Sequence, residues 1–515
     1  MSRLRCAVFV AFVVVSTLAG CATVNFDYPK SASTAFEDTD ETHLGRRAVP
    51  RAAAHGADES GFIVQVDGVD ALATRVLLSQ RAERSIDAQY YLISPDLVGY
   101  LFIDALLAAA DRGVRVRLLV DDILTGGRDA GMAALDSHPN FEVRIFNPIA
   151  RGGPRAWNLL TDFSRVNRRM HNKTFTVDNQ FTIIGGRNIA SEYFGARHDV
   201  NFGDLDTLAI GPVVKDVSNQ FDTYWNDEYA APVPAFAEIP EDPEAQLDAL
   251  RARIELAREE VGSTRYGEVL GDSVFEIIEL DSDDYTWAPY RLVYDSPGKA
   301  RGEELRPDES ILTSLASAVR QAKNELIIVS PYFVPPSTTI EGVRELVERG
   351  VDVVVITNSL ASNNHAVVHS AYAPTRKPLL EAGARLYEVR PDAGVASSRE
   401  TGATTAESNL HSKGFIVDRE VVFLGSFNWD PRSAYINTEL GVIMESPEIA
   451  GAIAGRIDQK MPSVAYEVSV DEDGRLRWVT HDDGREVVYG REPETGFWKR
   501  FSTGLMGLFP LDSQL

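Results

Sequence analysis

The stretch HNKTFTVDNQFTIIGGRN, residues 171–188, returns 240 positions later as HSKGFIVDREVVFLGSFN, residues 411–428. The two copies align over eighteen positions without a gap, and each contains HxKxxxxD followed by Gly-x-x-Asn. A single HxK arises often by chance, but two copies in register indicate an internal duplication. The recurring residues are His171, Lys173, Phe175, Val177, Asp178, Gly185 and Asn188, matched by His411, Lys413, Phe415, Val417, Asp418, Gly425 and Asn428.

The segments before each motif repeat as well. Each has an apolar run, a helix with an apolar face, a Gly that ends the helix and a second apolar run, which is the pattern of a βαβ unit. We therefore expect an α/β protein of two similar halves, each a mixed β-sheet flanked by helices, with the active site at their interface. The predicted elements are a strand at 85–93, a helix at 100–112 and a strand at 114–120, then a strand at 326–330, a helix at 338–348 and a strand at 351–357.

The repeated motif gathers basic and amide side chains. His171 and Lys173 are two residues apart, so they share one face of an extended strand. Gly185-Gly186 follows a second predicted strand at 181–184, and Asn188 then lies near a helix start. Facing halves double this set to two imidazoles, two ammonium groups and two amides. Such a set suits a phosphodiester: one histidine attacks phosphorus, the other protonates the leaving oxygen, and the donors hold the remaining oxygens.

Two simpler interpretations compete with this one. A histidine on a strand is often a core residue satisfied by its neighbours, and histidines also bind metal ions. The doubling of the whole set argues against the first interpretation. The lysine beside each histidine, and the lack of a His/Asp/Glu triad, argue against the second. We therefore expect neither a metal nor a cofactor.

The motif pair and its surroundings resemble the phospholipase D superfamily, the HKD enzymes, over roughly residues 60–460. Segments 170–173, 185–188, 201–210 and 368–380, the last with Tyr372 and Arg376, are similar to the C-type bacterial cardiolipin synthases. The resemblance implies a covalent phosphohistidine intermediate and no metal. It also implies that His171 is the nucleophile and His411 the acid, although the pseudo-symmetry of the site leaves the swapped roles open.

The resemblance further implies an acidic residue downstream of each motif that orients the histidine of the other half. Asp206 and Glu439 fit when Leu205-Asp206-Thr207-Leu208 is aligned with Thr438-Glu439-Leu440-Gly441, and Asp204 is the alternative to Asp206. Asp178 and Asp418 belong to the motif and are expected to steady the strands. The remaining residues that the resemblance assigns to catalysis or substrate binding are Lys173, Lys413, Asn188, Asn428, Ser426, Tyr372 and Arg376. Ser426 stands where the first half has Gly186, so one hydroxyl donor is missing there.

Arginines gather just before the first motif. Against the single Asp162, residues 151–170 hold Arg151, Arg155, Arg165, Arg168 and Arg169. We expect this cluster to attract anionic headgroups, with Arg165, Arg168 and Arg169 binding substrate. A solvated loop is the alternative. Trp157, Leu159 and Leu160 are candidates to contact acyl chains, with plain core packing as their alternative.

The N-terminus has the pattern of an export signal. Arg3 and Arg5 precede an apolar run at 6–15 that is too short to span a bilayer. Leu18-Ala19-Gly20-Cys21 resembles the lipobox of bacterial lipoproteins, which implies cleavage before Cys21 and diacylation of its thiol. Ala22 then favours sorting to the periplasmic face of the outer membrane, with the inner membrane as the alternative. An ordinary signal peptide is the competing interpretation.

The whole-chain composition narrows the class of function. The 515 residues include 51 Lys and Arg against 76 Asp and Glu, a net charge of −25, which disfavours a general nucleic-acid binder. The only cysteines are Cys6 and Cys21, so a disulfide framework is excluded. We expect a signal at 1–20, a tether at 21–59, one half at 60–240, a linker at 241–306 with a charged helix at 245–261, and the other half at 307–460. A β-meander with two Asp-Gly turns and an amphipathic tail then occupy 461–515.

The resemblance, together with the doubled motif, implies an enzyme that moves a phosphatidyl group from one phospholipid to an alcohol. With phosphatidylglycerol as the acceptor, the product is cardiolipin. The alternatives are a phospholipase D that uses water, a nuclease of the same superfamily, which the acidic composition disfavours, and a non-catalytic lipid-binding envelope lipoprotein. Protein partners and the oligomeric state are not predicted.

Overall fold

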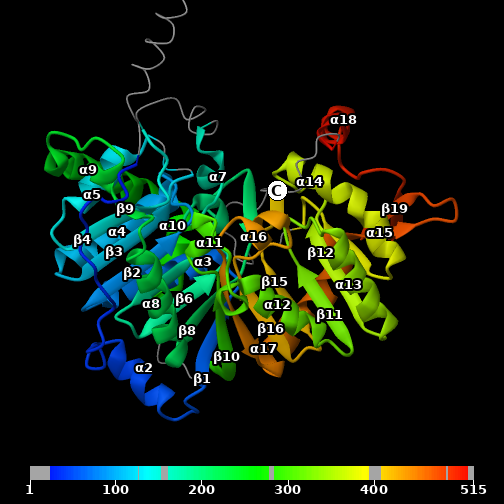
Figure 1. Cartoon of the computed structure of the whole chain (residues 1–515), viewed down its shortest axis with the longest axis horizontal. Coiled ribbons are helices and arrows are strands. Elements are labelled where there is room, and N and C mark those ends of the chain that lie inside the picture. The colour runs from blue at the N-terminus through cyan, green and yellow to red at the C-terminus, as the bar shows by residue number, and fades with distance from the viewer. Residues whose placement is uncertain are drawn as a thin grey trace, which may run out of the picture.

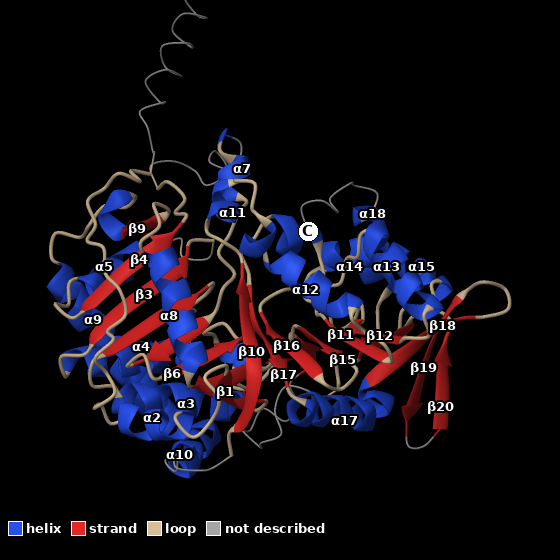
Figure 2. Ribbon diagram, turned by 60° about the horizontal axis from the view of Figure 1, so that its bottom comes forward, coloured by secondary structure: helices blue, strands red, loops and turns tan. Residues whose placement is uncertain are grey.

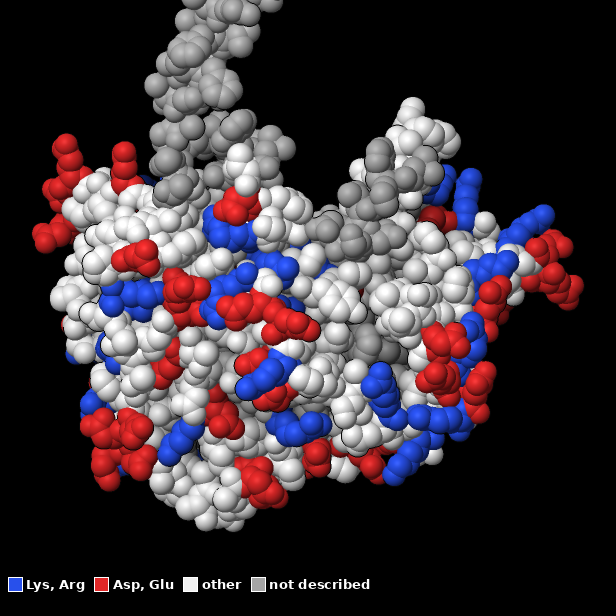
Figure 3. Space-filling view, in the orientation of Figure 1, with Lys and Arg blue, Asp and Glu red and all other residues white. Residues whose placement is uncertain are grey.

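The computed structural model describes residues 24–123, 125, 127–151, 161–277, 284–393, 407–482 and 485–507. Two α/β halves lie side by side and share a continuous sheet of eighteen strands (Figures 1 and 2). Acidic and basic side chains are interspersed over the face shown in Figure 3. Cys6, Cys21, Arg155, Trp157, Leu159 and Leu160 lie outside the described residues.

The first half contains β1 (Glu59–Gln65), α3 (Gly68–Arg81), β2 (Ser85–Tyr90), α4 (Leu97–Asp111), β3 (Arg115–Asp121), α5 (Asp129–Asp136), β4 (Phe141–Phe146), α7 (Phe163–Val166), β5 (Thr174–Val177), β6 (Phe181–Gly185), β7 (Val200–Gly203), β8 (Asp206–Ile210), α8 (Pro212–Trp225) and β9 (Ala230–Pro232). The helices α9 (Pro243–Gly262) and α10 (Arg265–Ile277) follow.

The second half contains β10 (Thr286–Tyr294), α11 (Gly298–Arg301), α12 (Ile311–Arg320), β11 (Glu325–Val329), α13 (Ser337–Glu348), β12 (Asp352–Asn358), α14 (Ala366–Tyr372), α15 (Arg376–Glu381), β13 (Arg385–Val389), β14 (Glu407–Leu410), β15 (Gly414–Val417), β16 (Val421–Gly425), α16 (Pro431–Tyr435), β17 (Leu440–Glu445) and α17 (Pro447–Val464). It ends with β18 (Ala465–Val470), β19 (Leu476–Asp482), β20 (Arg485–Tyr489) and α18 (Phe497–Met506).

The two halves repeat one strand order. It is β1-β8-β6-β5-β2-β3-β4-β9 in the first half and β10-β17-β16-β15-β11-β12-β13-β18 in the second. In each, two parallel pairs sit among antiparallel ones, so both sheets are mixed. The prediction of two similar halves with mixed sheets is confirmed, and the predicted βαβ units are β2-α4-β3 and β11-α13-β12.

The segment 241–306 is more than a linker. Its strand β10 is the first strand of the second half, and it pairs antiparallel with β1 from Glu59↔Pro289 to Phe62↔Thr286. That pairing joins the two sheets. The predicted charged helix is α9, which packs with α10 against the first-half helices α3, α4 and α5. The strand β10 has a weak strand pattern and follows a long helix in the sequence. The sequence alone therefore did not distinguish it from a linker.

The predicted tether packs against the first half over the residues that are described. The ring of Phe26 stacks on Tyr229 with centroids 4.7 Å apart, and the guanidinium of Arg115 lies 3.8 Å from the ring centroid of Phe36. A short helix, α2, covers Gly45–Ala52. The prediction of a free tether is therefore wrong for residues 24–59, because buried arginines of the sheet, such as Arg117, take carbonyl oxygens of this segment as acceptors.

The C-terminal segment forms the predicted meander, β18–β19–β20, with antiparallel pairing throughout. Gly474 adopts φ 75° in the first Asp-Gly turn, a conformation that favours glycine. The second such turn lies outside the described residues. Among the helices that the structure describes, none is long and apolar enough to cross a membrane.

Candidate active site

A contact between the halves sets the position of the first histidine. Met170 and Thr438 form a parallel bridge, in which the Thr438 amide donates to the carbonyl of Arg169 and the His171 amide donates to the carbonyl of Thr438, both at 2.9 Å. His171 therefore lies in extended chain just before β5, beside the residue that follows Thr438 in the other half. That residue is Glu439.

A second contact of the same kind positions the other histidine. Strands β7 and β14 come from different halves and form a two-stranded parallel sheet, which ends at the pair Leu410↔Gly203. The amides of His411 and Ser412 both donate to the carbonyl of Gly203, at 2.8 and 3.0 Å. His411 is thereby held next to Asp204.

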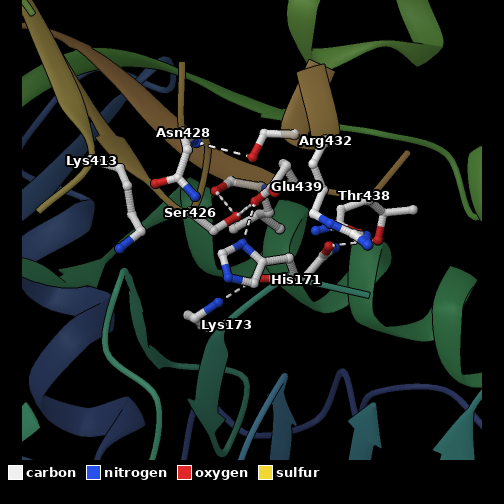
Figure 4. Close-up of polar contacts among 12 residues, drawn as sticks. His171, Lys173, Lys413, Ser426, Asn428, Arg432, Thr438 and Glu439 are labelled. Carbon is white, nitrogen blue, oxygen red and sulfur yellow. Dashed lines mark hydrogen bonds and ion pairs between the residues drawn. The ribbon is translucent and has the colours of Figure 1, made fainter. Parts of the chain in front are cut away.

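Each imidazole is hydrogen bonded to a carboxylate of the opposite half. Nδ1 of His171 lies 2.8 Å from Oε2 of Glu439 (Figure 4), and Nδ1 of His411 lies 2.6 Å from Oδ2 of Asp204. A carboxylate can only accept, so each Nδ1 carries the proton and each Nε2 is left unprotonated. This tautomer turns the unprotonated nitrogen away from the carboxylate.

The partner of His411 is Asp204 and not Asp206, which corrects the alignment used on the sequence. Gly185 pairs with Asp206, and the equivalent Gly425 pairs with Gly441. The position that matches Glu439, two residues before Gly441, is therefore Asp204. A shift by two keeps a side chain on the same face of a strand, so the sequence pattern alone did not distinguish the two acids.

Asp206 has a structural position. Its Oδ2 accepts from Arg75 Nη2 at 2.8 Å and lies 3.5 Å from Arg187 Nη1, and all three side chains are buried. A buried carboxylate between two guanidinium groups ties β8 to α3. The proposed orienting role therefore moves to Asp204.

The two lysines of the motifs line the space between the imidazoles. Lys173 Nζ donates to the carbonyl of His171 at 2.6 Å, and Lys413 Nζ contacts the carbonyl and ring of His411 and lies 3.8 Å from Oδ2 of Asp204. Both side chains are buried. Burial lowers the pKa of Lys173 to about 7 and that of Lys413 to about 8.

Burial and charge also fix the protonation of the histidine–carboxylate pairs. Burial lowers the pKa of His171, and burial together with Lys413 lowers the pKa of His411 to about 3. Burial disfavours the ionised forms of Glu439 and Asp204, but the neighbouring histidines and lysines outweigh it and keep both pKa values below their usual range. At pH 7 the site therefore holds neutral imidazoles and ionised carboxylates.

Ser426 and Gly186 differ for a steric reason. The hydroxyl of Ser426 donates to Oε2 of Glu439, the oxygen that also binds His171 (Figure 4). In the first half, a Cβ at position 186 would collide with Oδ1 of Asp204. Position 186 carries no hydroxyl because the carboxylate of Asp204 lies too close to its backbone for a side chain.

The two motif asparagines keep unused hydrogen-bonding groups. Nδ2 of Asn188 donates to the hydroxyl of Tyr193 at 2.9 Å, while the side-chain oxygens of Asn188 and Asn428 are buried without a partner. Oxygen and nitrogen of an amide are exchanged by a simple flip, so either end can face a ligand. Unsatisfied buried amides are costly, and a bound phosphodiester would satisfy them.

Aromatic rings form the walls of the site, and the sequence analysis missed them. Tyr91 meets the His171 ring edge-on with centroids 4.9 Å apart. Phe202 stacks on His411 at 5.4 Å, and Tyr193 and Tyr332 contact the same ring from the side at 4.9 and 6.3 Å. No spacing rule links these residues to the motifs. Tyr91, Phe202 and Tyr332 lie at or near the ends of β2, β7 and β11, and Tyr193 lies in the short turn Ser191–Tyr193.

Asp178 and Asp418 lie at the far ends of β5 and β15 from the histidines. Asp178 accepts from the backbone amides of residues 83, 84 and 85, and Asp418 from those of residues 323, 324 and 325, at 2.7–3.0 Å for the shortest bond to each amide. Both adopt a positive φ, of 51° and 53°. They close the turns and fix the start of the neighbouring strands, which is the steadying role expected from the sequence.

The described arginines of the cluster at 151–169 are engaged by acceptors of the chain itself. Arg151 pairs with Asp122 and Asp129, and Arg165 with Asp162. Arg168 donates to the carbonyl of Lys299 at 2.9 Å, and the buried Arg169 donates to that of Asn147. The prediction of free headgroup-binding charge is wrong for Arg169, and Arg165 and Arg168 are already bonded. Arg432, which donates to Asn167 and lies beside the site in Figure 4, was not anticipated.

Tyr372 and Arg376 belong to the second-half core and not to the site. Both contact Glu388, the tyrosine hydroxyl at 2.9 Å and Nε of the arginine at 2.6 Å, and Arg376 also pairs with Glu492. Arg376 is buried with 2 % of its side chain exposed. Their expected substrate-binding role is a wrong prediction, since a buried ion pair needs the same residue types.

The arrangement can carry out a double displacement at phosphorus. It offers two imidazoles with oriented tautomers, two ammonium groups and two amides at one junction between the halves. Among the described residues, no group of three or more His, Cys, Asp or Glu side chains is arranged to hold a metal ion. Nucleophile, acid and charge stabilisation are all available from side chains.

Comparisons with known proteins find relatives over most of the chain. The family model described as "Cardiolipin synthase, PLD-like domain" matches residues 78–225 and 315–461. The chain is 41% identical to Cardiolipin synthase C of Escherichia coli over 461 residues, covering 88% of this chain and 96% of that protein. It is 31% identical to an uncharacterized protein of Helicobacter pylori, with 96% and 97% covered. The solved phosphatidylserine synthase of Haemophilus influenzae has the same fold, with a TM-score of 0.54, 15% identity, and coverage of 81% of this chain and 91% of that chain.

Proposed function

The chain belongs to the family of cardiolipin synthases with phospholipase D-like domains, and we propose that it transfers a phosphatidyl group from one phospholipid to the hydroxyl of another. One observation carries the proposal: each half supplies the carboxylate that orients the other half's imidazole. With phosphatidylglycerol as the acceptor, the product is cardiolipin.

In the first step, Nε2 of His171 attacks the phosphorus of the donor lipid. The bond from phosphorus to the headgroup oxygen breaks, and His411 gives that oxygen a proton. This step requires His171 to be neutral and His411 to be protonated, and the charge of the phosphodiester anion favours the protonated form of the histidine that faces the leaving oxygen. Lys173, Lys413 and the motif asparagines stabilise the charge on the non-bridging oxygens.

In the second step, the hydroxyl of the acceptor lipid replaces the leaving group. His411, now neutral, takes the hydroxyl proton, the oxygen attacks phosphorus, and the bond from phosphorus to His171 breaks. Both histidines return to their starting states. Glu439 keeps the His171 ring in one orientation throughout and stabilises its positive charge in the intermediate.

The surroundings of the two Nε2 atoms support this assignment of roles. Nζ of Lys413 lies 3.1 Å and the hydroxyl of Tyr193 lies 3.4 Å from Nε2 of His411, whereas no hydrogen bond to Nε2 of His171 is found among the described residues. The open nitrogen suits the nucleophile, and the nitrogen with a polar neighbour suits the group that exchanges protons. Glu439, the partner of His171, also accepts a hydrogen bond from the hydroxyl of Ser426.

Product analysis tests the function. The purified protein is given vesicles of phosphatidylglycerol and phosphatidylethanolamine, and lipids and released headgroups are measured by mass spectrometry. We expect cardiolipin as the main product, with glycerol or ethanolamine identifying the donor and phosphatidic acid a minor product. Phosphatidic acid as the dominant product would contradict transfer in favour of hydrolysis. DNA cleavage without lipid turnover would contradict both.

We also propose that the mature protein is lipid-anchored through Cys21 at the periplasmic face of the outer membrane. The support is the sequence Leu18-Ala19-Gly20-Cys21 followed by Ala22. Changing Cys21 to Ala should block lipidation and leave an uncleaved precursor, visible as a larger band and as loss of incorporated palmitate. Normal processing of this variant would contradict the anchor without affecting the proposed reaction.

A further inference from the structure

The C-terminal helix α18 presents an apolar stripe to solvent. Phe497, Trp498, Phe501 and Leu505 are 64%, 75%, 53% and 51% exposed. At 100° per residue, these four positions lie within about 100° of the helix circumference. The three aromatic rings contact one another, with centroids 5.4–6.1 Å apart. The stripe is thus a continuous surface and not a scatter of single apolar residues.

The opposite side of α18 is attached to the protein. Thr503 is buried on this side of the helix. Lys499 Nζ donates to the carbonyl of Ala361 at 3.0 Å, and the helix packs against α14. Rotating the stripe inward would break these contacts. The fold therefore holds the apolar side of the helix outward.

The helix is attached at the rim of the active site. Ala361 lies in the loop after β12 that leads to His365, whose ring contacts Tyr332 with centroids 5.3 Å apart. Tyr332 in turn contacts His411. In Figures 1 and 2, α18 and α7 both rise on the same side of the molecule, one from each half. On α7, Phe163 is also exposed, and Figure 3 shows α18 as a mostly uncharged projection.

We propose that α18 inserts this stripe into the boundary between headgroups and acyl chains of a phospholipid bilayer and holds the mouth of the site against the membrane. Aromatic and leucine side chains on one face of a helix, with basic residues beside them, are the composition of interfacial helices. Lys499 and Arg500 are the only charged residues of α18. A chain of net charge −25 is not drawn to an anionic bilayer by its charge, so contact of α18 with the bilayer depends on the apolar stripe. The inference rests on the proposed function only in taking bilayer phospholipid as the substrate.

Insertion is measured on Trp498 in the full chain. Tryptophan emission is recorded with vesicles of phosphatidylglycerol and phosphatidylethanolamine that carry bromine on their acyl chains, for the wild type and for Trp498→Phe. The difference between the two isolates the emission of Trp498, because phenylalanine preserves the apolar stripe. We expect brominated vesicles to quench most of this emission and unbrominated vesicles to leave it unquenched. If brominated vesicles do not quench the emission of Trp498, the proposal is overturned, whether or not the protein turns lipid over.

Turnover gives a second, independent measurement. Phe497→Ser, Phe501→Ser and Leu505→Ser together should lower turnover of vesicle lipid by about tenfold or more, since each apolar side chain adds to partitioning into the bilayer. Turnover of a soluble short-chain phospholipid should stay unchanged. The control Leu256→Ser with Val488→Ser removes apolar side chains of similar exposure on α9 and β20. Equal loss in the control, or equal loss on the soluble substrate, would contradict a membrane role for α18.

Discussion

Oε2 of Glu439 lies 2.8 Å from Nδ1 of His171, although the two residues are 268 positions apart in the chain. The converse pair, Asp204 and His411, is separated by 207 positions and joined at 2.6 Å. Neither half therefore orients its own imidazole. The duplication gives one site with two complementary contributions instead of two independent sites.

Changing Asp204 to Asn should lower activity, whereas changing Asp206 to Asn should lower stability. Asp204→Asn removes the negative charge beside His411 and lets the amide donate to Nδ1, which favours the wrong tautomer, so kcat should fall by about a hundredfold or more with little change in Tm. Asp206→Asn leaves two buried guanidinium groups without their carboxylate, which should cost on the order of 3 kcal/mol of unfolding free energy. Paired kinetic and thermal-melting measurements decide the point. A larger catalytic loss in Asp206→Asn would restore the alignment used on the sequence.

Gly186 and Ser426 should not be interchangeable. Ser426→Gly removes one hydrogen bond to Glu439, and kcat should fall by about tenfold, the value of one hydrogen bond to a charged group. Gly186→Ser should lose more activity, because its Cβ collides with Asp204 and displaces the partner of His411. Steady-state rates of the two single variants test this order. Full activity in Gly186→Ser would show that Asp204 does not need its observed position.

kcat/KM should decline on the alkaline side of its pH profile, beginning near neutral pH. Charged lysines are needed to attract the phosphodiester, and in the free site the pKa of Lys173 is about 7 and that of Lys413 about 8. As pH rises through these values the ammonium charges are lost, so kcat/KM declines. The corresponding limb of kcat should lie at higher pH, because the bound anion stabilises the charged lysines.

Lys173→Arg provides the control for this profile. Arginine stays charged throughout the range, so in an active variant the alkaline limb should move from about 7 toward the value of Lys413. A kcat/KM that is flat from pH 6 to 10 in the wild type would contradict titration of the lysines. An unchanged limb in Lys173→Arg would assign it to another group.

Arg376 should matter for stability and not for substrate affinity. Arg376→Met breaks a buried pair with Glu388 and Glu492, which should lower the free energy of unfolding by about 3–5 kcal/mol. KM for the phospholipid should be unchanged in the fraction that stays folded. Denaturant titration and steady-state kinetics measure the two effects. A raised KM at unchanged stability would return Arg376 to the substrate site.

The sequence predicted the elements that depend on local pattern, and it missed what depends on pairing across the chain. The helix α4 and the strands β2 and β3 follow from hydrophobic period and a terminal Gly. Asp204 was exchanged for Asp206 because strand register, which only the partner strand defines, decides between them. The sequence also predicts substrate binding for Arg376 and Arg169, because it does not distinguish an arginine buried in an ion pair from one that binds phosphate.

The most direct test of the account is to trap the covalent intermediate. A phospholipid labelled on the phosphatidyl group is mixed with His411→Ala and with His171→Ala, and the reaction is quenched within one turnover. The label is carried by a phosphatidyl ester of p-nitrophenol, whose leaving group needs no proton from His411. His411→Ala should then accumulate label on His171, identified by peptide mass spectrometry, because the variant still lacks the base that activates the acceptor. His171→Ala should accumulate none. Label found on His411, or turnover by either variant at the wild-type rate, would contradict the mechanism.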